Sequence, residues 1–189
     1  MLPPTIPTAL KEWKLVTEAL ASGRQILLLR KGGIYESAGE FELEHRRFVF
    51  FPTWIHQNLN MLKSDAQAGF EPRSTEPEKV VMSAAGEVTD IVQVQSRAQM
   101  DRLDAEHIWT PPLIDMRFNY RPENPLYLLL VRAYRLPSPV TVDYTPAYAG
   151  CKSWVPLEEP VATAGATPAL DDASYAKRVE AIKAAMAST

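Results

Sequence analysis

A short motif at the end of an apolar run contains the first residues that are suited to binding a ligand. The motif "RKGG", residues 30–33, joins two cations to two glycines. A guanidinium offers a fork of donors that matches a phosphate, an ammonium adds a point charge, and glycine lets the backbone approach a ligand. The spacing is not that of a Walker or dinucleotide-binding loop. The motif predicts either a phosphate-binding turn or a hairpin turn with solvated charges. The candidate phosphate contacts are Arg30, Lys31, Gly32 and Gly33.

A second motif, "FPTWIHQ" at residues 51–57, brings an indole, an imidazole and a carboxamide close together. Thr53 is a suitable helix cap, and the free amides and dipole of a helix start attract anions. A tryptophan beside a glutamine also suits stacking on a base and reading its edge. The alternative is that Trp54 covers the core as a hydrophobic staple. This motif adds Trp54, His56 and Gln57 to the candidate site.

Two later motifs, "HIWTPP" and "GCKSWVPL", each place a tryptophan beside small or hydroxyl residues near an expected strand end. Together with Trp54, these indoles predict an aromatic-lined pocket, unless they fill the core instead. They add Trp109, Lys152 and Trp154 as candidate nucleic-acid-binding residues.

Acid–base chemistry is the main alternative to binding. The histidines are His45, His56 and His107, and none has the spacing of a zinc-binding pair. A nuclease or other hydrolase would use histidine with a nearby carboxylate. Its candidate residues are Glu42, Glu44, His45 and His56. No metal site and no cofactor is predicted, and no catalytic residue is assigned.

Composition narrows the class of protein. The net charge of −3 argues against a protein that coats nucleic acid through overall positive charge, but it allows a local basic groove. The single cysteine, Cys151, has no nucleophile signature around it and allows no intrachain disulfide. Since no apolar run approaches the roughly 20 residues that span a bilayer, we expect a cytoplasmic protein without membrane association.

The elements that must position these residues follow from periodicity and from capping residues. The pattern predicts helices over 7–23, from Thr53 to Leu62, over 96–107 and over 171–189. It predicts strands over 25–30, 41–51, 87–95, 108–120 and 126–136. Residues 64–86 have weak periodicity and are expected to form a long, partly helical connection.

These elements predict an α+β fold. Strands that are close in sequence favour antiparallel pairing, so we expect a mixed, mainly antiparallel sheet or a small β-barrel flanked by helices. Residues 1–157 are expected to form one domain, and 158–170 have the Ala-, Thr- and Pro-rich composition of a linker. Residues 171–189 form an amphipathic helix that packs on the domain or on a partner. Its apolar stripe is Tyr175, Val179, Ile182 and Met186.

Several motifs together resemble one known family. "ALKEW", "LLLRKGGI", "FELEHRRFVFFPTWIHQ", "HIWT", "LYLLLVRAYRLP" and "GCKSWV" are similar, in order and spacing, to the bacterial family catalogued as domain of unknown function 1802, over about residues 9–157. The resemblance implies an association with restriction-endonuclease-like domains and a place in restriction–modification. It carries over no catalytic residues.

A weaker resemblance concerns the fold. A helix ending at Gly23, followed by Gln25 and Arg30 in "GRQILLLR", is similar to the opening of PUA-like folds of the ASCH type. In that pattern a lysine usually stands at the position of Gln25 and a glutamate at that of Leu28. PUA-like domains often bind RNA or modified bases, so both resemblances imply nucleic acid as a partner.

The leading hypothesis is a nucleic-acid-binding module that reads modified or flipped bases beside a nuclease. Its expected partners are DNA or RNA and a restriction-endonuclease-like protein, and the oligomeric state is left open. The alternatives are the hydrolase and a non-catalytic protein-interaction domain that docks through the C-terminal helix. Arg30 and Trp54 can share one site only if the sheet curls as a barrel does.

Overall fold

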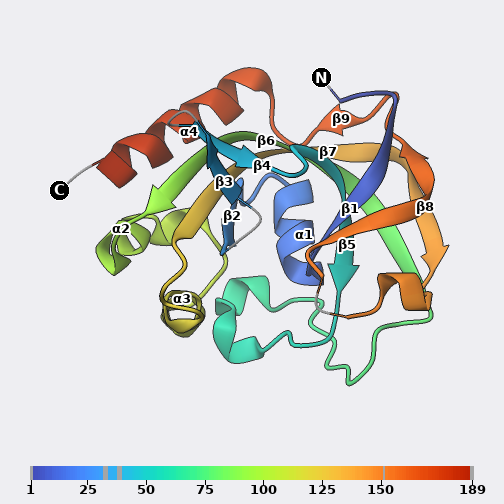
Figure 1. Ribbon diagram of the computed structural model, residues 1–189, viewed down its shortest axis with the longest axis horizontal. Coiled ribbons are helices and arrows are strands. Elements are labelled where there is room, and N and C mark those ends of the chain that lie inside the picture. Colours follow the sequence, from blue (N-terminus) through green and yellow to red (C-terminus); the bar gives the residue numbers. More distant parts are fainter. Residues whose placement is uncertain (1, 32–33, 38–39, 151, 188–189) are drawn as a thin grey trace.

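Strand-forming apolar runs build a curved sheet around one central helix (Figure 1). The computed structural model describes residues 2–31, 34–37, 40–150 and 152–187. The sheet has seven strands in the order β2-β7-β6-β5-β1-β8, with β9 paired to β7. Its strands are β1 (Thr5–Trp13), β2 (Leu27–Arg30), β5 (Arg47–Thr53), β6 (Lys79–Val94), β7 (Leu126–Asp143), β8 (Trp154–Ala162) and β9 (Thr167–Pro168). The helices are α1 (Lys14–Ala21), α2 (Arg97–Arg102), α3 (Pro111–Asn119) and α4 (Asp172–Ala187). The predicted mixed, mainly antiparallel α+β class is confirmed.

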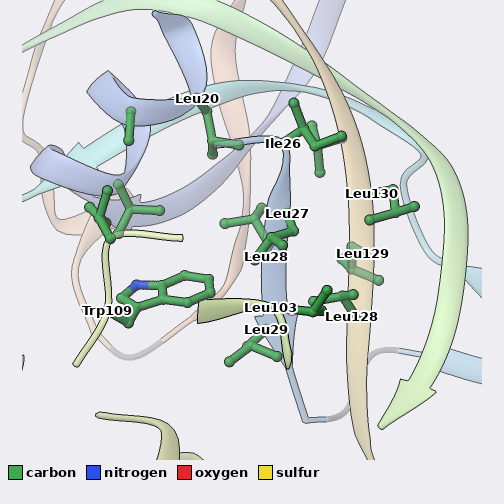
Figure 2. Packing of buried hydrophobic residues seen from close by; sticks show 14 of the residues in the cluster. Leu20, Ile26, Leu27, Leu28, Leu29, Leu103, Trp109, Leu128, Leu129 and Leu130 are labelled. Carbon is green, nitrogen blue, oxygen red and sulfur yellow. The ribbon is translucent and has the colours of Figure 1, made fainter. Parts of the chain in front are cut away.

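The long antiparallel pair β6–β7 forms the centre of the sheet. The predicted strand over 126–136 is confirmed, and Leu128, Leu129 and Leu130 are fully buried beside the β2 leucines (Figure 2). The predicted strand over 87–95 is also confirmed, but it begins earlier, at Lys79. The end of the expected connection therefore belongs to β6. Two register shifts between β6 and β7 bend the pair, as β-bulges do.

The helix predicted over 7–23 is wrong in its first half. Residues Thr5–Trp13 form β1, which pairs with β5 in parallel and with β8 antiparallel, and the helix α1 starts only at Lys14. Apolar residues in this stretch fit either period, and burial between two neighbouring strands favours the strand. The predicted stop is correct, because Gly23 adopts a positive φ of 77°. Helix α1 packs against β1, β5, β6 and β7.

The expected strand over 41–51 is divided in two. Glu40–Leu43 form β4, which pairs with β3 (Ile34–Ser37) as a separate two-stranded sheet, and β5 starts at Arg47. Alternation is confirmed in β5, since Phe48 and Phe50 enter one core cluster while Val49 and Phe51 enter the other.

The helix expected to start at Thr53 is also wrong. Strand β5 continues through Pro52 and Thr53, paired with β1, and a short 3-10 turn at Leu59–Met61 is the helical part of the expected segment. Pairing of β5 with β6 covers Arg47–Val49, so Pro52 lies beyond the β6 pairing and is paired with Glu12 of β1 on the other side.

The strand predicted over 108–120 is instead helix α3, Pro111–Asn119. Two prolines fall in its first turn, where a backbone N–H is not needed, and Thr110 occupies the N-cap position. The predicted strand is therefore wrong, and the proline pair was the better signal.

The predicted helices near 96–107 and 171–189 are confirmed. Ser96 and Gln99 form a capping box at the start of α2. Helix α4 packs along α2, and its predicted stripe of Tyr175, Val179, Ile182 and Met186 is buried against the body. The apolar stripe thus has an intramolecular partner (Figure 1).

The Ala- and Pro-rich segment 158–170 does not have the extended, unpaired structure of a linker. Most of its first half belongs to β8, which pairs with β1, and Thr167–Pro168 form β9 on β7. Composition predicted otherwise because edge strands tolerate proline and small residues.

The sheet is open, and it curls enough to bring its two edges together. Arg30 ends β2 at one edge, yet its guanidinium donates to the carbonyl of Lys11 and to Glu12, both in β1. It also donates to Ser153 Oγ, just before β8 at the other edge, at 3.4 Å. Within the described ranges, no helix combines the length and hydrophobicity that crossing a membrane requires.

Candidate functional site

A polar cavity of about 310 Å³ lies where the end of β2 meets the ends of β1 and β5. The segments around it are far apart in sequence and meet because the sheet curls. The residues that line the cavity are Lys11, Glu12, Trp13, Arg30, Thr53, Ile55, His56, Glu76, Arg117, Tyr144, Gly150 and Lys152.

A buried ion pair forms one side of this cavity. Arg30 Nη2 lies 2.9 Å from Glu12 Oε2, and the two side chains are 14% and 7% exposed. The other Glu12 oxygen accepts a hydrogen bond from the Trp13 backbone N–H at 2.9 Å. Burial lowers the pKa of Arg30, and the Glu12 carboxylate opposes this shift.

Three polar atoms at the cavity are buried and have no hydrogen-bond partner among the described residues. They are Arg30 Nε, Glu76 Oε1 and Arg117 Nε. A buried polar atom without a partner costs roughly 1–3 kcal/mol, so such atoms concentrate where a ligand completes the bonding. The residues that line the cavity thus carry two donors and one acceptor without a partner among the described residues.

The cavity carries a surplus of positive charge together with aromatic rings. Its cations are Lys11, Arg30, Arg117 and Lys152, and its carboxylates are Glu12 and Glu76. Lys11 already donates to the carbonyls of Tyr148 and Gly150 and lies 5.6 Å from the Tyr144 ring. An anionic ligand with an aromatic, hydrogen-bonding part matches this lining.

The structure brings three of the predicted site residues together here: Arg30, His56 and Lys152. His56 does not lie in a helical first turn as expected. It has a left-handed backbone with φ of 68°, in the turn that follows β5. The helix-dipole argument therefore does not apply to His56, although its side chain still lines the cavity.

Lys31 lies outside the cavity lining and contacts helix α3. Its ammonium donates to the carbonyls of Phe118 at 2.9 Å, Tyr120 at 2.8 Å and Arg121 at 3.2 Å. A cation at a helix C-terminus satisfies the last carbonyls and complements the helix dipole. Lys31 thus positions the end of α3, which carries Arg117. The neighbouring candidates, Gly32 and Gly33, lie outside the described residues.

Replacing Lys31 with methionine should loosen the end of α3. Hydrogen bonds from a charged donor contribute about 1.5–3 kcal/mol, so we expect amides near Tyr120 to exchange roughly tenfold faster or more with deuterium. Hydrogen-exchange mass spectrometry of wild type and variant measures this. Lys79→Met, which removes an exposed lysine paired with Asp143, is the control and should leave α3 unchanged. Equal exchange in both variants would contradict the positioning role.

Trp54 and Gln57 lie beside the cavity without lining it. The Trp54 backbone N–H donates to Glu76 Oε2 at 2.9 Å and so positions that carboxylate. The Trp54 indole Nε1 is buried without a partner within the described structure. Gln57 Oε1 accepts from the Leu15 N–H in the first turn of α1, and its amide donates to the Trp54 carbonyl.

The other two tryptophans pack elsewhere. Trp109 is buried in the main core, with its ring directed toward the β2 leucines (Figure 2). Trp154 begins β8 and makes edge contacts with His45 and Phe48, at ring-centroid distances of 5.4 and 5.3 Å. Neither lines the cavity. The structure does not unite the three indoles in one pocket.

The residues of the hydrolase alternative do not converge with the cavity. His45 Nε2 lies 3.6 Å from Glu44 Oε1 on a partly exposed turn, and neither residue lines the cavity with His56. The side chain of Glu42 lies outside the described part. Among the side chains that are described, no cluster of His, Cys, Asp or Glu is arranged to hold a metal ion.

Sequence reasoning missed Glu12, Glu76 and Arg117. Glu12 was assigned to a helix and Arg117 to a strand, so neither was expected to face Arg30. Glu76 lies in a connection without periodicity. The motif "ALKEW" contained a usable signal, because it places Glu12 and Trp13 among the residues that resemble the family.

The position that is usually lysine in ASCH-type domains has a structural role here. Gln25 is fully buried, accepts from the Ile108 N–H at 3.0 Å and donates to the Leu27 carbonyl at 2.7 Å. Leu28, at the glutamate position, is also fully buried. These two positions therefore contribute to the core and not to the cavity.

Comparison with known proteins gives a family and a set of similar folds. Residues 9–181 match the family described as "Domain of unknown function (DUF1802)". No curated protein sequence matches the chain. The ASCH structure from Zymomonas mobilis is 13% identical with a TM-score of 0.45 and covers 92% of this chain and 93% of its own. A serine-to-alanine mutant of that protein has the same identity and TM-score and covers 95% and 99%.

The family resemblance that the sequence motifs predicted is thus confirmed. The family match extends from β1 to helix α4 and includes every cavity residue. The chain therefore belongs to the DUF1802 family, whose function is undefined.

Proposed function

We propose that the chain binds nucleic acid and holds one unstacked nucleotide in the polar cavity. The proposal is supported chiefly by the unpartnered buried atoms of Arg30, Glu76 and Arg117 around that cavity. A nucleobase edge presents both donors and acceptors, which matches two donors and one acceptor in the wall. Trp13 and Tyr144 offer aromatic faces at the same cavity.

The charge distribution supports the same ligand class. The chain has a net charge of −3, yet the lining residues carry more cations than carboxylates. A local cationic site in an acidic protein suits recognition of a single nucleotide better than coating of a long duplex. We further propose, from the family resemblance, that this module works beside a restriction-endonuclease-like nuclease.

The binding test uses fluorescently labelled single-stranded DNA, single-stranded RNA and a duplex with one mismatched pair, at low salt. Fluorescence anisotropy should show binding, strongest for substrates with an unpaired base. Arg117→Gln should weaken binding by roughly tenfold or more, because it removes a charged donor at the cavity.

The salt dependence supplies the control. Lys152→Gln should lower the slope of log affinity against log salt by about 0.7 for a single strand, since it removes one phosphate-neutralising charge. Lys177→Gln removes the same charge from an exposed position on α4 that does not line the cavity, and it should leave the slope unchanged. Absence of binding to all three nucleic acids at low salt would refute the proposal.

A further inference from the structure

A second cavity, of about 430 Å³, adjoins the polar one. Its lining is mainly apolar and aromatic. The residues are Trp13, His56, Asn58, Met61, Met116, Arg117 and Tyr120. Both cavities have volumes near the low end of the roughly 300–1,000 Å³ typical of ligand sites. The family match assigns no role to this second cavity.

The two cavities share three residues, Trp13, His56 and Arg117. The indole of Trp13 therefore borders both. Arg117 contributes a guanidinium at the same boundary, and its Nε is buried without a partner among the described residues. A guanidinium at the boundary between the two cavities suits a phosphodiester that links two bases, one in each cavity.

The far wall of the second cavity is formed by the end of α3. Tyr120 and Met116 line it and are 54% and 37% exposed, which is unusual for large apolar side chains in this protein. The Tyr120 carbonyl accepts a hydrogen bond from Lys31, and the Arg121 guanidinium lies 5.3 Å from the Tyr120 ring. An exposed aromatic ring on a backbone that is already fixed loses little entropy when a base stacks on it.

We infer that the site takes two adjacent nucleotides of a single strand, with the second base in the apolar cavity and the linking phosphate at Arg117. This inference rests on the proposed function and defines its ligand as a dinucleotide step. A stacked base needs an aromatic face but few hydrogen bonds, which fits a cavity whose polar groups are Asn58, His56 and Arg117.

The test compares mononucleotides with dinucleotides by isothermal titration calorimetry on the full chain. The probes are 5′-mononucleotides of the four ribo and four deoxy bases, the corresponding 5′-phosphorylated homodinucleotides, and dinucleotides with a neutral methylphosphonate link. Dinucleotides should bind roughly 5- to 150-fold more tightly than mononucleotides, the range expected for stacking one base. The neutral link should reduce that gain by at least about tenfold, because it removes the negative charge that pairs with Arg117.

Variants separate the two cavities. Tyr120→Ala should abolish most of the dinucleotide gain and leave mononucleotide affinity unchanged, because Tyr120 lines the second cavity and not the first. Val81→Ala removes another exposed apolar side chain, on β6 away from both cavities, and should change neither affinity. Since Tyr120 and Val81 are both exposed, both variants should fold, which circular dichroism checks.

The outcomes distinguish the inference from the proposed function. Mononucleotide binding without any gain for dinucleotides, or a gain that survives both Tyr120→Ala and the neutral link, overturns the dinucleotide site while the single-nucleotide site stands. Failure of every nucleotide to bind overturns both. A gain that Tyr120→Ala removes, with mononucleotide affinity intact, supports the inference.

Discussion

Replacing Arg30 with methionine is expected to lower the free energy of unfolding by about 3 kcal/mol. The change leaves the Glu12 carboxylate buried without its cationic partner, while the Trp13 N–H still donates to it. Breaking a buried ion pair by removing one partner costs about 3–5 kcal/mol, because the other charge stays desolvated. The low end applies because Arg30 keeps 14% of its side chain exposed. The variant also removes the contact that joins β2 to β1 across the curl of the sheet.

Chemical denaturation of a double-mutant cycle measures this effect. Removing both charges, with Glu12→Gln added to Arg30→Met, should restore part of the stability, because no buried charge then lacks a partner. Arg47→Met is the matched control, since Arg47 pairs with Glu87 across neighbouring strands but is 49% exposed. It should cost less than about 1 kcal/mol. Equal losses for Arg30→Met and Arg47→Met would show that the buried pair does not hold the edges together.

The second large effect concerns acid stability and His107. The pKa of His107 is lowered from 6.5 to about 4, mainly by burial and also by the Lys63 ammonium, while Asp104 partly opposes the shift. As pH falls below 6.5, the unfolded chain binds a proton at this position while the folded chain does not. Stability is therefore lost between pH 6.5 and about 4, by about 3 kcal/mol in total. Above pH 7 the imidazole is neutral in both states, and the contribution is constant.

His107→Gln should remove this part of the pH dependence. Denaturation curves between pH 7.5 and pH 4 give the unfolding free energies of wild type and variant. Toward low pH the wild type should lose about 3 kcal/mol more stability than the variant. The carboxylates titrate in both proteins, so their contribution cancels in the difference between the two unfolding free energies. An NMR titration locates the proton directly: the His107 imidazole resonances should not shift until the pH approaches 4. A midpoint near 6.5 would contradict the burial argument.

The position of His107 also explains why sequence patterns did not identify it. It is buried beside Trp109, with ring centroids 5.3 Å apart, between the 3-10 turn Asp104–Glu106 and helix α3. Trp109 belongs to the main core cluster, and His107 beside it is 5% exposed. In the sequence, His107 was one of three isolated histidines without a metal-binding spacing.

The sequence by itself determined the elements whose signals are local. The continuous apolar runs predicted β2 and the start of β7, the cap residue Ser96 predicted the start of a helix, and helical spacing predicted the buried stripe of α4. The family followed from short motifs in a fixed order. Each of the secondary-structure signals lies within one continuous segment of the chain, so no long-range contact is needed to interpret it.

The tertiary structure decided the elements whose pattern fitted two periods. Thr5–Trp13 became a strand because β5 and β8 flank it on both sides, and no local feature reveals those neighbours. Pro52 could remain in β5 because the pairing with β6 ends before it. In both cases the free energy that selects the conformation comes from hydrogen bonding and burial between distant segments.

The candidate site also divides into residues that local sequence identified and residues that only the tertiary structure identified. Arg30, His56 and Lys152 could be selected from residue type and motif, whereas Glu12, Glu76 and Arg117 could not. Arg30 contacts Glu12, eighteen positions away, and Ser153, in a much later segment of the chain. These contacts form because the register shifts between β6 and β7 and the twist of the sheet curl β2 toward β1 and β8. Residue types therefore determined which side chains could bind a nucleotide, and the curvature of the sheet decided which of them share a cavity.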